Sequence, residues 1–213
     1  MTMREFAQQH PLAMFFLGAF AGAWLFMIPL ALSAQHLLPP LPPALHYASA
    51  YGPMLSAFFV TWLTGGGEGL REFMGRMCKW RVGWRWLVIS ALSPLFLYAL
   101  GAIAARTVEG EWPAFLQLGQ PNFLPDLGLL GALLLWIFNS GLGEETGWRG
   151  FALPHLQRNH GALTATLILA LFWSLWHIPA FFYLPSYRQV GLRVLPGFFV
   201  RSVLWRDCAD LAL

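Results

Sequence analysis

Charged residues are scarce in this sequence. Only 11% of the 213 residues are Asp, Glu, Lys or Arg, and 57% are hydrophobic. A soluble domain carries about 25% charged residues. Because several apolar runs are also close to 20 residues long, the composition predicts a polytopic membrane protein. The length suffices for a single helical membrane domain over residues 1–213, without a separate soluble domain.

Cysteine is nearly absent as well, and the motifs of several hydrolase classes are missing. Cys78 and Cys208 lie far apart in the sequence and near predicted cytoplasmic ends, so they suggest neither a disulfide framework nor a CxxC metal site. The sequence contains no HExxH and no GxSxG, and no aspartate lies inside a predicted span. These absences argue against a zincin, an α/β-hydrolase and a two-aspartate intramembrane protease.

The apolar runs predict an all-α fold, a polytopic transmembrane helical bundle of about six spans. We expect these spans at residues 12–33, 44–64, 84–105, 127–148, 161–177 and 190–204. The first run exceeds the roughly 7–15 apolar residues of a secretory signal, so we interpret it as an uncleaved span. Within it, Gly18 and Gly22 form a small-xxx-small pair that would allow another helix to approach closely; equally, glycine is common in membrane helices without such a role. Pro53 should kink or restart the second span, and the glycines at 65–67 should end it.

The composition of residues 68–86 differs from that of the predicted spans. Their basic residues are Arg71, Arg76, Lys79, Arg81 and Arg85. Apolar residues recur at spacings of three, four and seven between Leu70 and Met77, which defines one face of a helix. This combination predicts one interfacial helix on the cytoplasmic leaflet and favours a lipid bilayer over nucleic acid as the partner.

The basic residues are distributed unequally between the two sides of the membrane. Segments 1–11, 65–85, 149–160 and 201–213 hold one, five, two and two of them, ten of the 13 Lys and Arg. The intervening loops hold the other three. The positive-inside rule therefore predicts an integral membrane protein with a cytoplasmic N-terminus.

One acidic pair interrupts the apolar runs. Glu144 and Glu145 fall within the predicted span 127–148. A charge at the centre of a span costs about 2.5–3.5 kcal/mol and usually marks a functional site. Glu145 precedes Arg149 by four residues, the favourable order for an ion pair along a helix. Glu144 points about 100° away from Glu145, and we predict that it is left free for chemistry.

His177, at the end of the span 161–177, is the predicted partner of Glu144. Counting along the spans places Glu144 toward the inner side and His177 toward the outer half, so the two meet only if the helices are tilted or shifted. Nearby glycines are expected to leave room beside Glu144 for water or a substrate backbone: Gly141, Gly143, Gly147 and Gly150. Two simpler interpretations stay open. Glu144, Glu145 and Arg149 could have no role other than to hold helices together. His177 could be an interfacial residue.

This pattern resembles the CPBP family, the CAAX-processing and bacteriocin-processing intramembrane proteases that are also called Rce1-like or Abi proteins. The resemblance rests on Glu144-Glu145-x-x-x-Arg149 and on the aromatic segment that ends in His177. Further matching stretches are Tyr51-Gly52-Pro53, Trp80-Arg81-Val82-Gly83-Trp84-Arg85-Trp86 and Arg149-Gly150-Phe151-Ala152-Leu153-Pro154. The resemblance covers roughly residues 45–185. It implies a protein of the bacterial plasma membrane that acts on a protein or peptide substrate.

The resemblance also implies roles for the site residues. Glu144 would activate the attacking water with help from His177, and Glu145 and Arg149 would support the site. A zinc ion held by Glu144 and His177 and a metal-free glutamate mechanism both stay open, because two ligands are fewer than catalytic zinc sites use.

Two positions depart from the family pattern. Trp173 stands where the family has phenylalanine, and an aromatic substitute should keep the packing. No histidine follows His177, so the His-x-x-x-Asn motif assigned to the oxyanion is missing. We therefore expect the chain to be truncated or frame-shifted near Val200. Loss of one oxyanion donor typically costs about 10²–10³ in rate, so impaired activity is expected.

The sequence thus predicts an intramembrane endopeptidase that hydrolyses a peptide bond with a glutamate-activated water. The alternative is a non-catalytic membrane scaffold or bacteriocin-immunity protein with the same fold. A small-solute transporter would show inverted internal repeats, and none is seen in the sequence.

Overall fold

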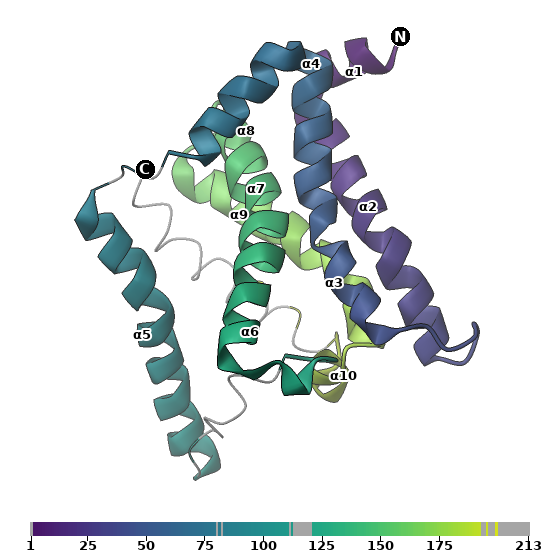
Figure 1. Ribbon diagram of the computed structural model, residues 1–213, viewed down its shortest axis with the longest axis vertical. Coiled ribbons are helices and arrows are strands. Elements are labelled where there is room, and N and C mark those ends of the chain that lie inside the picture. The colour runs from purple at the N-terminus through teal and green to yellow at the C-terminus, as the bar shows by residue number, and fades with distance from the viewer. Residues whose placement is uncertain are drawn as a thin grey trace.

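The computed structural model describes residues 2–79, 81, 83–110, 112, 121–192, 195 and 199. The regular structure of these residues is helical, which confirms the all-α prediction. The helices are α1 (Met3–Gln9), α2 (Pro11–Ala34), α3 (His46–Ser49), α4 (Tyr51–Met77), α5 (Trp84–Glu109), α6 (Gly128–Trp136), α7 (Glu145–Gly147), α8 (Leu153–Gln157), α9 (Ala162–Trp176) and α10 (Pro185–Val190) (Figure 1).

Three helical segments among the described residues are long and apolar enough to cross a membrane. They are Pro11–Ala34, Pro125–Gln157 and Ala162–Phe182. They confirm a membrane protein, whereas the predicted count of about six spans is not established by them. The predicted last span, 190–204, and the predicted break near Val200 lie almost entirely outside the described residues.

Helix α4 combines part of the predicted second span with the predicted interfacial helix. Its backbone breaks at Gly66, where φ is 60° and ψ is −151°, a conformation that glycine adopts without a steric penalty. Beyond Gly66 the helix changes direction (Figure 1). Phe73 in this second section is buried against Phe58 and Phe151, whereas Met74 stays exposed. The amphipathic segment is therefore anchored to the bundle through Phe73.

Helices α2 and α4 approach each other through glycine. A Cβ atom at Gly22 would lie 3.1 Å from the Cα of Gly52, and one at Gly52 would lie 2.8 Å from the carbonyl oxygen of Ala19. A Cβ at Gly18 would overlap the hydroxyl of Ser56. This hydroxyl donates a hydrogen bond of 2.8 Å to the carbonyl of Phe15 on α2. The small-xxx-small pair is thus a real helix contact.

The acidic helix is longer and less regular than predicted. Residues 125–157 form one continuous helical segment, in which two π-helical stretches, Ile137–Glu144 and Trp148–Ala152, flank α7. Since helix continues past Trp148, Glu144 lies near the middle of the segment and not near its inner end. A π-helical turn repositions side chains relative to an α-helix and is frequent at functional sites.

Two of the glycines around the acidic pair serve helix packing. A Cβ at Gly143 would lie 2.8 Å from the carbonyl oxygen of Ala50, and one at Gly147 would lie 2.5 Å from backbone atoms of Pro53. The expectation that these glycines leave room for water or substrate is therefore wrong, because α4 and the residue before it fill the space beside them.

Aromatic side chains join the acidic helix, α2 and α9. Trp148 is fully buried, with its ring centroid 5.5 Å from that of Phe15 and 6.0 Å from that of Trp176. The Trp176 indole donates a hydrogen bond to the carbonyl of Ala19 at 3.3 Å, and the Trp24 indole donates one to the carbonyl of Trp176 at 3.0 Å. These contacts fix the end of α9, and therefore His177, relative to the helix that carries Glu144.

Candidate active site

Glu144 and His177 line the same cavity, which has a volume of about 310 Å³. Four sections of the chain contribute to its wall: residues 46–50, Asn122, the helical segment from Trp136 to Glu144, and residues 176–187. The two residues that the sequence predicted to meet therefore lie on the wall of one cavity. The sequence placed Glu144 and His177 at different depths in the membrane because the helix that carries Glu144 was expected to end near Trp148. That helical segment continues to Gln157.

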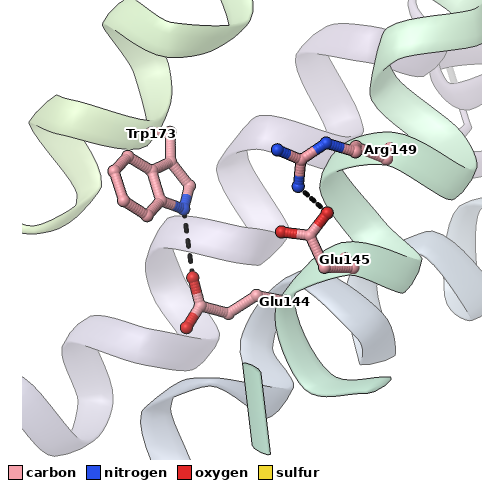
Figure 2. A network of polar contacts seen from close by, with 4 residues as sticks. All are labelled: Glu144, Glu145, Arg149 and Trp173. Atoms are coloured by element: carbon pink, nitrogen blue, oxygen red, sulfur yellow. Dashed lines mark hydrogen bonds and ion pairs between the residues drawn. The ribbon is translucent and has the colours of Figure 1, made fainter. Parts of the chain in front are cut away.

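The ion pair predicted along the helix is present. The Arg149 guanidinium donates a hydrogen bond to the Glu145 carboxylate, four residues earlier (Figure 2). Glu145 is 37% exposed and Arg149 is 21% exposed, so the pair lies at the edge of the packed helices. The ion pair therefore keeps the Glu145 carboxylate close to its own helix.

The other carboxylate has a partner on a different helix. The indole Nε1 of Trp173, on α9, donates a hydrogen bond of 3.0 Å to Oε2 of Glu144 (Figure 2). The prediction that Glu144 is left free is wrong in this respect. Sequence reasoning treated Trp173 as a packing substitute for phenylalanine. The overlooked signal was the indole N–H, a donor that phenylalanine lacks.

His177 is buried and is oriented by the same tryptophan. Its Nδ1 lies 2.8 Å from the carbonyl oxygen of Trp173, and the two rings pack at 4.2 Å between centroids. Because a carbonyl can only accept, Nδ1 must carry the proton in this hydrogen bond. In the neutral imidazole, Nε2 is then an acceptor. Trp173 thus contacts both Glu144 and His177.

Sequence reasoning missed several polar residues that line the cavity or contact its wall. The His46 ring nitrogen Nδ1 and the Tyr183 hydroxyl are 2.6 Å apart, and the Asn139 amide donates to the carbonyl of Tyr47 at 2.5 Å. Burial raises the pKa of the Tyr183 hydroxyl above its ordinary value, so this group keeps its proton at neutral pH. These residues come from three separate parts of the chain, and no local motif connects them.

Part of the chain matches a known protein family. Residues 125–207 match the family model described as type II CAAX prenyl endopeptidase Rce1-like. This part of the chain is similar to the Rce1-like family, and residues 125–207 are called the Rce1-like region below. The Rce1-like region contains Glu144, Glu145, Arg149, Trp173 and His177. The resemblance seen in the sequence is therefore confirmed for this region.

A curated relative is similar to the chain over a short stretch. The chain is 42% identical over 67 residues to the CAAX prenyl protease 2 of Methanococcus maripaludis, a stretch that makes up 32% of this chain. The chain spans about a fifth of that relative's length, 22%. No solved structure matches the chain.

The donor set of the Rce1-like site does not by itself fit a zinc ion. Catalytic zinc sites use about three protein ligands, and Glu144 and His177 supply two. Within the described ranges of the chain, no group of three or more His, Cys, Asp or Glu side chains could hold a metal. We therefore assign no step of the reaction to a metal.

The Glu145–Arg149 ion pair should contribute to the thermal stability of the protein. We expect Glu145→Gln and Arg149→Gln each to lower the Tm in detergent, and the double variant to lower it by less than their sum. The coupling free energy should be about 0.3–1 kcal/mol, as for partly exposed helical pairs. Thermal unfolding of the four proteins measures it. Strict additivity would show that the pair contributes nothing to stability.

Proposed function

We propose that this protein is an intramembrane endopeptidase of the Rce1-like type. The observation that supports the proposal is that Glu144 and His177, from two different helices, line one cavity inside a bundle of apolar helices. A carboxylate and an imidazole beside the same enclosed space can bind and activate a water molecule. The substrate would be a protein or peptide reached from the bilayer of a bacterial plasma membrane.

The proposed reaction begins with a water molecule between the two side chains. The Glu144 carboxylate removes a proton from this water, and the water oxygen attacks the carbonyl carbon of the scissile peptide bond. Nε2 of neutral His177 accepts a hydrogen bond from the water and orients it. When the C–N bond breaks, Glu144 returns the proton to the leaving nitrogen. Trp173 restricts the Glu144 carboxylate to one orientation through its indole N–H.

A second candidate is a non-catalytic scaffold or immunity protein. The Trp173–Glu144 hydrogen bond favours it in one respect, because a bond between helices is what a purely structural carboxylate would make. The two candidates differ in their response to substitution. A scaffold keeps its cellular phenotype in Glu144→Gln, whose carbonyl oxygen can still accept the indole hydrogen bond, and loses it when helix packing is disrupted.

The test of the proposed function is cleavage of membrane-anchored candidate peptides by the purified protein in lipid vesicles. Wild type should cleave and Glu144→Ala should not, at equal amounts of folded protein. Equal cleavage by both proteins would overturn the assignment of Glu144. Treatment with EDTA is a separate arm, in which loss of cleavage that zinc restores would add a metal to the mechanism.

Trp173→Phe tests the positioning of Glu144. Phenylalanine keeps a large ring on α9 and removes the N–H donor. A hydrogen bond to a charged group contributes about 1.5–3 kcal/mol, so we expect kcat to fall by roughly tenfold or more with KM nearly unchanged. Steady-state kinetics measure both constants. Trp62→Phe, which makes the same chemical change at an exposed tryptophan, is the matched control. A rise in KM alone would assign Trp173 to substrate binding.

A further inference from the structure

A second imidazole lines the cavity that Glu144 and His177 share. It belongs to His46, the first residue of α3. The His46 ring packs against the ring of Tyr183 at 5.6 Å between centroids, and its Nδ1 lies 2.6 Å from the Tyr183 hydroxyl. The proposed reaction gives no task to this imidazole, although it faces the same enclosed space.

Two contacts fix α3 against the helical segment that carries Glu144. The side-chain amide of Asn139 donates a hydrogen bond of 2.5 Å to the carbonyl of Tyr47. The residue after α3, Ala50, packs so closely that its carbonyl oxygen would lie 2.8 Å from a Cβ atom at Gly143. Because Tyr47 follows His46 and Gly143 precedes Glu144, these contacts hold the imidazole in a set position relative to the carboxylate.

The Tyr183 hydroxyl decides which nitrogen of His46 carries the proton. Tyr183 is 6% exposed and is not part of the cavity wall, so its O–H needs an acceptor inside the protein. Among the described residues, the acceptor within reach is Nδ1 of His46, at 2.6 Å. This distance is also shorter than the range of about 2.7–3.2 Å for N–H···O bonds. Nδ1 therefore accepts, and the neutral ring carries its proton on Nε2.

The two imidazoles of the cavity thus have opposite tautomers. His177 donates from Nδ1 to the Trp173 carbonyl and keeps Nε2 as an acceptor, whereas His46 accepts at Nδ1 and keeps Nε2–H as a donor. An acceptor suits the attacking water, and a donor suits the negative charge that develops on the carbonyl oxygen. We infer that His46 is a further catalytic residue, whose Nε2–H binds the carbonyl oxygen of the scissile peptide. This inference rests on the proposed endopeptidase function.

The inferred step transfers no proton to or from His46. When the water oxygen attacks the carbonyl carbon, the π electron pair of the C=O bond moves to the oxygen, which becomes anionic. Nε2–H of His46 donates a hydrogen bond to this oxygen and keeps its proton. The electron pair then returns, the C=O bond is restored and the C–N bond breaks. The leaving nitrogen takes the proton that Glu144 removed from the water.

Other hydroxyl donors of the cavity wall are directed to backbone carbonyls. The Ser49 hydroxyl donates to the carbonyl of His46 at 2.6 Å, and the Tyr47 hydroxyl donates to the carbonyl of Asn122. These bonds occupy donors that could otherwise serve a substrate. The imidazole of His46 differs from them, because the bond to Tyr183 uses its acceptor and leaves its donor for the cavity.

Two amide substitutions separate a catalytic His46 from a structural one. In His46→Asn, the side-chain oxygen can replace Nδ1 as acceptor for Tyr183, and no group reaches the position of Nε2. In His46→Gln, the amide nitrogen can replace Nε2–H, and the acceptor is lost. We expect kcat for peptide cleavage in vesicles to fall about 10²–10³-fold in His46→Asn, as for loss of one oxyanion donor, with KM nearly unchanged. His46→Gln should restore most of this loss.

His160→Asn, the same change at an exposed histidine, is the matched control and should cleave at the wild-type rate. A purely structural His46 predicts the opposite order, with His46→Asn fully active and His46→Gln impaired in both Tm and cleavage. That order would overturn the inference and keep the endopeptidase function. Absence of cleavage by wild type under the same conditions would instead contradict the proposed function itself, and the role of His46 with it.

Nitrogen-15 NMR of histidine-labelled protein tests the tautomer without any cleavage. At neutral pH, His46 should show the resonances of a neutral ring protonated on Nε2, and His177 those of a ring protonated on Nδ1. The signals that disappear in His46→Asn, or in His46→Gln if the asparagine variant does not fold, assign His46. A His46 ring protonated on Nδ1 in the wild-type protein would overturn the inference whatever the activity of the variants.

Discussion

Glu144→Gln should reduce the rate of peptide cleavage by about 10²–10⁴-fold, the typical contribution of a general base. The amide cannot take a proton from water, so the proposed activation step is lost. Its carbonyl oxygen can still accept the hydrogen bond that the Trp173 indole donates at 3.0 Å to the native carboxylate. The packing of α9 against the acidic helix should therefore be preserved, with Tm close to that of wild type.

The measurement is single-turnover cleavage in vesicles, together with thermal unfolding of the same preparations. Glu72→Gln is the matched control, since it makes the same chemical change at an exposed residue on the second section of α4. We expect this control to cleave at the wild-type rate. A fully active Glu144→Gln protein with normal Tm would exclude Glu144 as the base and favour the scaffold alternative.

Gly147→Leu should prevent accumulation of folded protein, and Gly147→Ala should already be strongly destabilising. A Cβ atom at this position would lie 2.5 Å from the carbonyl carbon, carbonyl oxygen and Cβ of Pro53. Two of these atoms belong to the backbone, and the proline ring fixes the local conformation, so α4 must move as a unit to make room. Overpacking of a core costs about 1–3 kcal/mol, and the larger leucine side chain should exceed that range.

Gly141→Ala is the control for this prediction. Gly141 is exposed on the same helical segment, and a Cβ atom there would lie 3.6 Å from the carbonyl oxygen of Trp136, an ordinary contact. Gly141→Ala should fold at the wild-type level. The yield of monodisperse protein and its Tm measure both variants. A Gly147→Ala protein as stable as Gly141→Ala would show that α4 does not pack against this face.

The features that sequence reasoning predicted correctly are those set by local spacing. The scarcity of charge and the long apolar runs require helices in a bilayer, because lipid offers no partners for backbone polar groups. The Glu145–Arg149 pair follows from the rise and turn of one helix. Gly18 and Gly22 predicted a close helix contact for the same reason, although the sequence did not identify α4 as the partner.

Features that depend on the meeting of distant segments needed the tertiary structure. Trp173 and Glu144 belong to different helices, and no pattern along the chain shows that an indole N–H reaches this carboxylate. The bounds of the acidic helix also depended on its surroundings. It continues through Trp148, which is fully buried among aromatic rings of α2 and α9.

The sequence by itself determined the class of protein and the resemblance of residues 125–207 to the Rce1-like family, and it predicted the residues that we propose to carry the site. These follow from composition and from short spacings, which a helix converts directly into shared faces. Only the tertiary structure decided what surrounds Glu144: an indole donor from Trp173, a cavity shared with His177, and close packing of Ala50 and Pro53 against Gly143 and Gly147. The physical reason is that side-chain environments are set by how helices pack, and packing depends on contacts between residues far apart in the chain.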